Sequence, residues 1–250
     1  MPVMLEKAPL WLRLYPLWQW LFFMPAAVAL TVIAALVAVP TALVSARAAN
    51  LHVAVRWSRL LAILTPARVE VNGLKHIDPD QSYVVVANHQ SQFDIPVIYG
   101  FCGLDLRWVM KAELRKVPFV AAGCRAIGHI FIDRSDPEQS RDAINQAVSR
   151  LQPGTGILFF PEGTRSRSGQ LLPFKKGAFR VAVDQQLPIL PMTVSGTRNV
   201  LPAGSLSLRP GAVRLTIHPP VVTAGCRTGD ADQLKASVRT IIAGGLEDAA

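Results

Sequence analysis

A histidine and an aspartate that could act together in proton transfer directly follow the apolar run at residues 83–87. They are His89 and Asp94, the second and last residues of the stretch NHQSQFD. An imidazole held by a carboxylate is a general base with a fixed tautomer. Five positions correspond to about 140° around a regular helix, so the pair meets only if His89 precedes a helix and Asp94 lies in its first turn. Spacing alone favours a simpler alternative, in which Asp94 caps that helix and His89 only hydrogen-bonds the strand end.

A second polar segment, PEGTR at residues 161–165, follows the apolar run at residues 156–160. Its backbone amides, hydroxyl and guanidinium are the groups that bind a phosphate dianion well. Three further cations follow closely in the sequence: Arg167, Lys175 and Lys176. Taken alone, this motif is also compatible with a solvated turn among ordinary surface cations.

The elements that must position these residues alternate between strands and helices. Short apolar or β-branched runs predict strands at residues 68–71, 83–86, 106–110, 129–132, 156–160, 189–194 and 213–217. Helix patterns lie at residues 174–185, at residues 230–242, and from Pro137, capped by Ser135 or Asp136, to before Pro153. This alternation predicts one α/β domain over residues 66–250, with a largely parallel sheet flanked by helices. Polar clusters at the carboxyl ends of such strands are where open α/β sheets bind ligands.

The N-terminal region, residues 1–65, is predicted to be a membrane anchor followed by an interfacial helix. Residues 14–46 contain no charged side chain, and residues 21–44 would span roughly 36 Å as a helix, against about 30 Å of hydrocarbon. Pro25 and Pro40 offer an alternative in which the segment folds as a shallow hairpin. A cleaved signal peptide is disfavoured because its apolar region is only about 7–15 residues long. Tryptophans suited to an interfacial belt stand at the leading edge, and they are Trp11, Trp18 and Trp20.

The next segment has an apolar stripe and a basic back. The stripe consists of Val53, Trp57, Leu60, Leu61 and Leu64, with His52, Arg56 and Arg59 opposite it. Such a helix either lies on anionic lipid or packs on the following domain. More cations follow the anchor than precede it, which predicts a cell (inner) membrane protein with its main domain on the cytoplasmic face.

Composition narrows the class of protein further. Twenty-six Lys and Arg against 17 Asp and Glu give a net charge of +9, hydrophobic residues make up 50%, and the mean hydropathy is +0.30. These values exclude a disordered chain and favour an anionic membrane surface or substrate before nucleic acid. Three scattered cysteines, Cys102, Cys124 and Cys226, predict reduced thiols rather than a disulfide framework, and no spacing of ligands predicts a metal or a cofactor. The absence of Gly-x-Ser-x-Gly disfavours a serine hydrolase.

Taken together, the motifs resemble the glycerolipid acyltransferase family that includes lysophosphatidate (1-acylglycerol-3-phosphate) acyltransferases. Residues 88–94 look like its His-x4-Asp block, residues 128–134 (GHIFIDR) its second, residues 160–166 its third, and residues 187–191 its proline-bearing fourth, the loosest match. KAEL at residues 111–114 is similar to a further family stretch, and order and spacing agree from about Val69 to Thr197.

The resemblance implies acyl transfer from acyl-CoA or acyl carrier protein to the sn-2 hydroxyl of lysophosphatidate, which gives phosphatidate for phospholipid biosynthesis. It implies that His89 takes the hydroxyl proton and that Asp94 orients His89. The remaining site residues are implied to bind the glycerol phosphate or shape its pocket: Arg165 with Arg134 and Lys111 for the phosphate, and Glu162, Gly163 and Thr164 for the pocket. Glu162 is expected to anchor the turn or Arg165 rather than to act on the substrate.

Four alternatives stay open at this point. The acceptor could be another lysolipid, such as a lyso-ornithine lipid, or the donor could be a second phospholipid in a transacylation. A cysteine acyl-enzyme on Cys102 or Cys124 is formally possible, although buried structural thiols are the commoner explanation. The chain could also be a membrane lipid-binding protein without catalysis, against which the intact His89, Asp94, Glu162 and Arg165 speak.

Overall fold

The computed structural model describes residues 15–133 and 136–247. Its centre is a seven-stranded sheet in the order β1-β7-β6-β2-β5-β3-β4. The strands are β1 (Ala67–Asn72), β2 (Tyr83–Ala87), β3 (Asp105–Lys111), β4 (Ile130–Ile132), β5 (Thr155–Phe159), β6 (Ile189–Ser195) and β7 (Gly211–Ile217). All neighbours are parallel except β6 and β7, so the predicted α/β fold with a largely parallel sheet is confirmed. Trp11, Arg134 and Ser135 lie outside the described residues.

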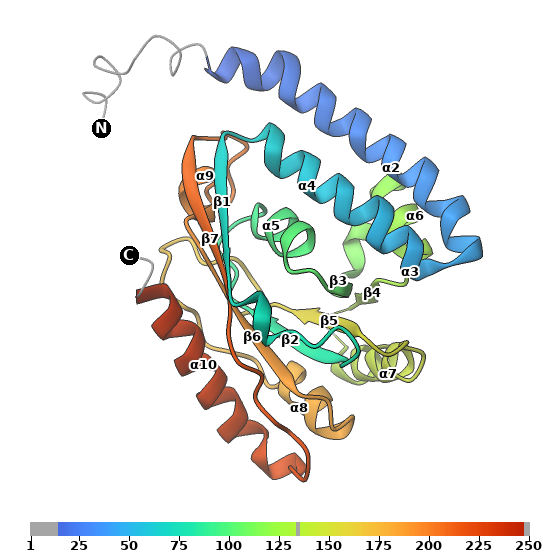
Figure 1. Cartoon of the computed structure of the whole chain (residues 1–250), viewed down its shortest axis with the longest axis vertical. Helices are drawn as coiled ribbons and strands as arrows, with labels where there is room; N and C mark the ends of the chain where they lie inside the picture. The colour runs from blue at the N-terminus through green and yellow to red at the C-terminus, as the bar shows by residue number, and fades with distance from the viewer. Residues whose placement is uncertain (1–14, 134–135, 248–250) are drawn as a thin grey trace.

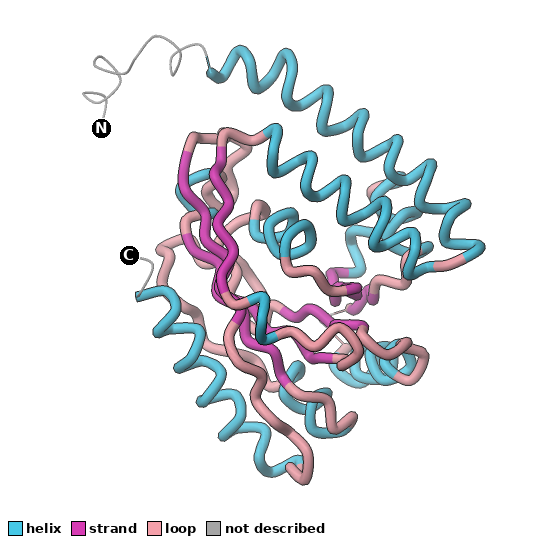
Figure 2. Tube along the Cα trace, viewed as in Figure 1, coloured by secondary structure: helices cyan, strands magenta, loops and turns pink. Residues whose placement is uncertain are grey.

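Helices cover both faces of this twisted sheet (Figures 1 and 2). One face packs against α7 (Pro137–Val148), α8 (Gly177–Asp184) and α10 (Ala231–Glu247), and the other against α5 (Asp94–Phe101) and α4 (Val55–Leu64). Alternate residues of β2 pack into the cores on the two faces of the sheet, because successive side chains of a strand point to opposite faces. Val84 and Val86 belong to the first core, and Val85 and Ala87 to the second.

Helix boundaries follow local sequence signals. Asp136 accepts the backbone N–H of Gln139 at 2.9 Å, so it is the side-chain cap of α7, which begins at Pro137 as predicted. A turn at Asn72-Gly73 ends β1, with Gly73 at φ 83° before the 3₁₀ turn Leu74–His76. The remaining short helices are α3 (Ala46–Ala49), α6 (Pro118–Ala126) and α9 (Thr197–Val200), with 3₁₀ turns at Ala112–Lys116 and Thr228–Asp230.

The N-terminal apolar segment forms one continuous helix over Tyr15–Val44, long and apolar enough to cross a membrane. It includes a π-helical turn at Gln19–Phe23 followed by α2 (Met24–Val44). Neither Pro25 nor Pro40 breaks it, and the chain turns instead at the extended Ser45. In Figure 1 the following segment runs back beside α2 through α3, the π-helical turn Asn50–Ala54 and α4.

The two N-terminal arms are the helix over Tyr15–Val44 and the returning helical segment over residues 46–64. Both pack against the α/β domain. Gly123 of α6 lets Ala35 of α2 approach, and Gly100 of α5 accommodates the backbone of Ser58 in α4. The predicted apolar stripe of residues 53–64 is therefore divided, with Trp57 and Leu61 turned to an internal cavity and Leu60 and Leu64 exposed. The outer face of α2 is exposed and apolar.

Candidate active site

The side chains of His89 and Asp94 meet at the carboxyl end of β2. His89 lies in the turn after the strand and Asp94 is the first residue of α5, which is the arrangement that their spacing requires. Nδ1 of His89 lies 2.8 Å from Oδ2 of Asp94. With Nδ1 facing the carboxylate, Nε2 is the ring nitrogen left to accept a proton from a substrate.

Asp94 is fully buried and its carboxylate is tightly held. Oδ2 also accepts the backbone N–H groups of Gln90 at 2.7 Å and Ser91 at 2.9 Å, and Oδ1 accepts the hydroxyl of Thr197. The carboxylate thus points back into the loop before α5, whose N-cap residue, Phe93, makes no side-chain cap hydrogen bond. The simpler alternative, a helix cap without contact to His89, does not describe this geometry.

Aromatic side chains fix the plane of the His89 ring. Phe160, the residue after β5, stacks on it with ring centroids 4.0 Å apart and an interplanar angle of 18°. Trp108 of β3 meets Phe160 edge-on at 6.5 Å. The imidazole is thereby confined between its carboxylate partner and a flat apolar surface.

The PEGTR segment follows β5 and binds the backbone of His89 on both sides. Oε1 of Glu162 accepts the His89 N–H at 2.7 Å, and the Ser166 N–H donates to the His89 carbonyl at 2.8 Å. Oε2 of Glu162 accepts the N–H of Leu172 at 2.9 Å. Glu162 therefore accepts backbone amides from two other segments, whereas from the sequence we expected it to anchor its own turn or Arg165.

Burial raises the pKa of Glu162 to about 7. The two backbone N–H groups that it accepts, together with the Arg239 charge, lower the pKa, whereas the negative charge of Asp94 raises it further. Gly163, at φ 72°, makes the turn beside it, and a Cβ there would lie 2.9 Å from the Lys175 side chain. Only glycine fits this left-handed position without displacing Lys175.

A cavity of about 580 Å³ opens in front of His89. Its polar wall carries Lys111, from the end of β3, with Gly163, Thr164 and Arg165. Neither Lys111 nor Arg165 pairs with a carboxylate among the described residues, so both charges face the cavity uncompensated. From the sequence we assigned these four residues to one pocket together with Glu162 and Arg134. In the structure Glu162 is buried and does not line the cavity, and Arg134 is outside the described residues.

The rest of the wall is mostly apolar, and part of it comes from the N-terminal arms. Sequence reasoning did not assign these residues to a site: Phe23, Met24, Ala27, Trp57 and Leu61, with Leu201, Leu206 and Leu208 of the segment between α9 and β7. Their apolar character was visible in the sequence, but their contact with the site depends on how the two arms fold back. A mainly apolar cavity with two cations in one part of its wall suits an amphiphile with an anionic head.

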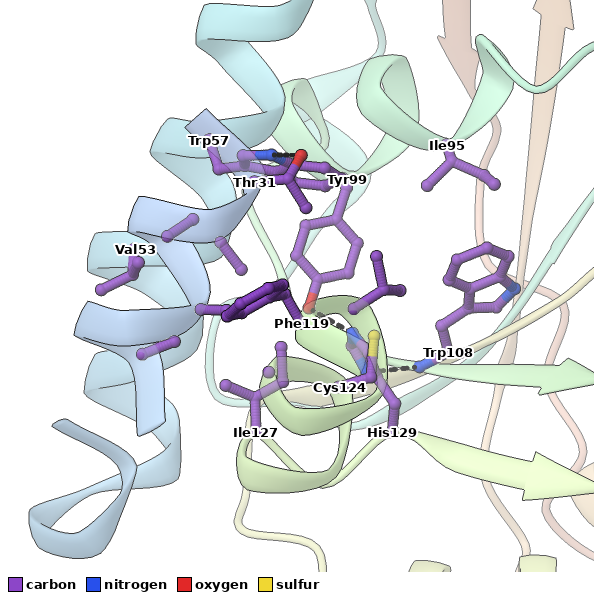
Figure 3. A pocket seen from close by; sticks show the side chains of 16 residues that line it. Thr31, Val53, Trp57, Ile95, Tyr99, Trp108, Phe119, Cys124, Ile127 and His129 are labelled. Carbon is purple, nitrogen blue, oxygen red and sulfur yellow. Dashed lines mark hydrogen bonds between the residues drawn. The ribbon is translucent and has the colours of Figure 1, made fainter. Parts of the chain in front are cut away.

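A smaller apolar cavity of about 100 Å³ adjoins the first and shares Trp57, Ile95 and Trp108 with it (Figure 3). His129, from the second sequence block, lies in its wall, and Nδ1 accepts the backbone N–H of Trp108 at 3.2 Å. Nε2 faces the Tyr99 hydroxyl at 3.2 Å, which also donates to Asn50 of the N-terminal arm. Burial, helped by the Arg107 charge, lowers the pKa of His129 to about 3, so this imidazole is neutral and structural.

Comparison with known proteins agrees with this geometry. The family model described as "Acyltransferase" matches residues 68–195. A crystal structure of the 1-acyl-sn-glycerophosphate (LPA) acyltransferase PlsC from Thermotoga maritima is 34% identical with a TM-score of 0.71, covering 81% of this chain and 80% of that one.

Curated relatives carry the same activity in their names. The 1-acyl-sn-glycerol-3-phosphate acyltransferase alpha of Ovis aries is 35% identical over 70% of this chain and 62% of its own length. The chloroplastic acyltransferase BAT2 of Brassica napus is 34% identical over 62% of this chain and 45% of its own length. The chain thus spans about half to two thirds of these relatives. It belongs to the acyltransferase family that includes the 1-acyl-sn-glycerol-3-phosphate acyltransferases.

Proposed function

We propose that the protein transfers an acyl group from an acyl thioester to the sn-2 hydroxyl of 1-acylglycerol 3-phosphate and so forms phosphatidate. The observation that carries this proposal is the His89–Asp94 pair, 2.8 Å apart, with His89 in the wall of a largely apolar cavity that also carries Lys111 and Arg165. The names of the relatives support the choice of acceptor. Residues 66–250 form the acyltransferase domain in this proposal, and residues 1–65 its membrane anchor.

In the proposed reaction, Nε2 of His89 accepts the sn-2 hydroxyl proton as that oxygen attacks the thioester carbonyl carbon. The tetrahedral intermediate then collapses, the C–S bond breaks, and the leaving thiolate takes the proton from His89. Asp94 stabilises the imidazolium that forms in between, and proton transfer of this kind contributes about 10²–10⁴-fold. Because a thioester is already activated, no covalent enzyme intermediate is needed.

The phosphate of the acceptor is assigned to Arg165 and Lys111, with Arg134 as a third candidate. Arg165 supplies the planar, bidentate donor that a phosphate prefers, and Lys111 adds a point charge. Gly163 and Thr164 complete that wall, and Glu162 holds it against His89. The apolar wall and the adjoining cavity provide room for acyl chains.

The long apolar helix associates the protein with a membrane. We place it at the cell inner membrane with the domain on the cytoplasmic face, because Arg47, Arg56, Arg59 and Arg68 follow the segment whereas only Lys7 and Arg13 precede it closely. Met24 and Ala27 of the helix line the active-site cavity, so a lipid acceptor can reach His89 beside the anchor. The water-soluble donor, acyl-CoA or acyl carrier protein, would arrive from the other side.

The test is acyl transfer from acyl-CoA to lysophosphatidate by the purified, detergent-solubilised protein. We expect phosphatidate from the wild type, a loss of at least about 10²-fold in His89→Ala, and full activity in His76→Ala, a control in the turn after β1. Folding of each variant is checked by its melting temperature. Folded wild-type protein that forms no phosphatidate from lysophosphatidate with either acyl-CoA or acyl carrier protein donors would refute the proposal.

A further inference from the structure

Asp94 is held from two separate parts of the chain. Its Oδ2 faces His89 and the loop before α5, whereas its Oδ1 accepts the hydroxyl of Thr197 at 2.5 Å. The residues of this second contact are 103 positions apart in sequence, and both side chains are completely buried. Thr197 thus supplies the hydrogen bond to the carboxylate oxygen that faces away from the imidazole.

The position of Thr197 is fixed by the backbone before it. Gly196 ends the turn after β6 at φ 81°, and a Cβ there would lie 2.1 Å from the carbonyl oxygen of Ala212 in β7. No other residue fits between these backbones without moving them. The close approach of the two strands therefore places Thr197 opposite the start of α5.

Two further contacts join the same segments. The side-chain amide of Asn88 exchanges two hydrogen bonds with the backbone of Val194, each 2.8 Å long, and Asn88 is also fully buried. The hydroxyl of Ser91 donates to the carbonyl of Leu201 at 2.5 Å. Residues 194–201 thus hold the His89–Asp94 loop at three points, of which only Thr197 contacts the carboxylate itself.

We propose that Thr197 is a positioning residue, which acts through Asp94 on the orientation of His89. An isolated carboxylate can rotate about its last side-chain torsion, because such torsions have broad minima. With Oδ1 bonded to Thr197, rotation would break hydrogen bonds at both oxygens in a site from which water is excluded, and each unmade bond there is costly. Thr197 does not line the cavity, so it affects the reaction without touching substrate.

The inference rests on the proposed function, and its test compares four purified variants with the wild type in the same acyl-transfer assay. Thr197→Val keeps the shape and removes the hydroxyl, and we expect kcat to fall about tenfold with KM for lysophosphatidate unchanged. Thr197→Ser retains the hydroxyl and should keep at least about half of the wild-type kcat. Thr197→Cys, a weaker donor, should fall between the two.

Thr193→Val is the matched control. Thr193 is equally buried in β6, but its hydroxyl contacts Nε2 of His218 at 2.8 Å and the carbonyl of Ile242, away from Asp94. It should lower the melting temperature and leave kcat within about twofold of the wild type. If Thr197→Val fails to fold, the test is the comparison of the other two variants, and kcat should be higher for Thr197→Ser than for Thr197→Cys.

Three results would overturn the inference while leaving the proposed function intact. They are a Thr197→Val kcat within twofold of an active wild type, equal kcat values for the serine and cysteine variants, and a change confined to KM. An inactive wild type, by contrast, contradicts the proposed function itself.

Discussion

The carboxylate of Glu162 accepts the backbone N–H of His89 at 2.7 Å, across 73 positions of sequence. The same carboxylate accepts the N–H of Leu172 at 2.9 Å. One side chain therefore joins the turn after β2, the turn after β5 and the segment that leads to α8. A buried carboxylate that accepts two amides can fix the position of a neighbouring base without contact with the substrate.

Glu162→Gln should lower kcat. The glutamine oxygen can accept one of the two N–H groups, but its NH₂ group then faces the other N–H, donor against donor. We expect a fall of about tenfold in kcat with a smaller change in KM, measured by acyl transfer to lysophosphatidate. Glu70→Gln, at an exposed position of β1, is the control and should match the wild type. Equal kcat in Glu162→Gln and Glu70→Gln would show that the two amide contacts do not position His89.

The raised pKa of Glu162 also predicts how stability depends on pH. Between its ordinary pKa of 4.5 and its folded value of about 7, the folded protein retains a proton that the unfolded chain has released. The free energy of unfolding therefore decreases as pH rises through this window, by at most about 1.4 kcal/mol per pH unit.

Glu162→Gln removes that ionisation and isolates its contribution. The lowered pKa of His129 acts in the opposite direction but in both proteins alike. The unfolding free energy of the wild type, relative to the variant, should thus decrease between about pH 5 and pH 7 in denaturant titrations. A difference that stays constant across this range would mean that Glu162 is not protonated there in the folded state.

Arg165→Ala should chiefly raise KM for the phosphate-bearing acceptor. Arg165 lines the cavity, and its charge has no carboxylate partner among the described residues. We expect at least a tenfold increase of KM for lysophosphatidate and little change for a monoacylglycerol, which lacks the phosphate. Arg165→Lys should recover only part of the affinity, because an ammonium cannot bind bidentately.

The control for Arg165 is Arg167→Ala, an exposed arginine two positions further on. The KM of the Arg167→Ala variant for lysophosphatidate should remain close to the wild-type value. Equal KM changes in the two variants would indicate a general effect of positive charge, and an unchanged KM in Arg165→Ala would place the phosphate elsewhere.

Much of this architecture could be predicted from local sequence. The strand–helix alternation and the cap at Asp136 follow from residue types and spacing within one element or turn. The contact between His89 and Asp94 was implied by the family resemblance, because spacing alone favoured a helix cap without that contact. What the sequence did not predict depends on long-range pairing. Insertion of β7 between β1 and β6, antiparallel to β6, aligns Gly196 with Ala212 and so places Thr197, and no local pattern encodes that contact.

For the N-terminal arms too, the sequence predicted the local structure but not the partner against which it packs. The apolar stripe at residues 53–64 correctly predicted an amphipathic helix, but its two possible neighbours, lipid and protein, are both apolar. In the structure, the backbone of Ser58 packs against Gly100 and the indole N–H of Trp57 donates to Thr31 of α2 at 3.1 Å, and Trp57 faces the cavity. Hydropathy alone cannot distinguish a lipid-facing surface from a protein-facing one. It measures only how strongly a side chain prefers to leave water, and it does not identify the apolar surface that the side chain then contacts.

Gln19 gives the last prediction, since it is a buried polar residue in the mainly apolar N-terminal helix. Its side-chain amide donates to the carbonyl of Leu206 and accepts the N–H of Leu208 at 2.9 Å, as a neighbouring strand would. Gln19→Leu keeps the volume but leaves both backbone groups unpaired, at a cost of about 1–3 kcal/mol each. We therefore expect a lower melting temperature and, because Leu206 and Leu208 line the cavity, a raised KM for lysophosphatidate. Gln152→Leu, at an exposed position, is the control and should change neither the melting temperature nor KM. If Gln19→Leu also changes neither quantity, the hydrogen bonds of Gln19 do not hold the helix against the segment that contains Leu206 and Leu208.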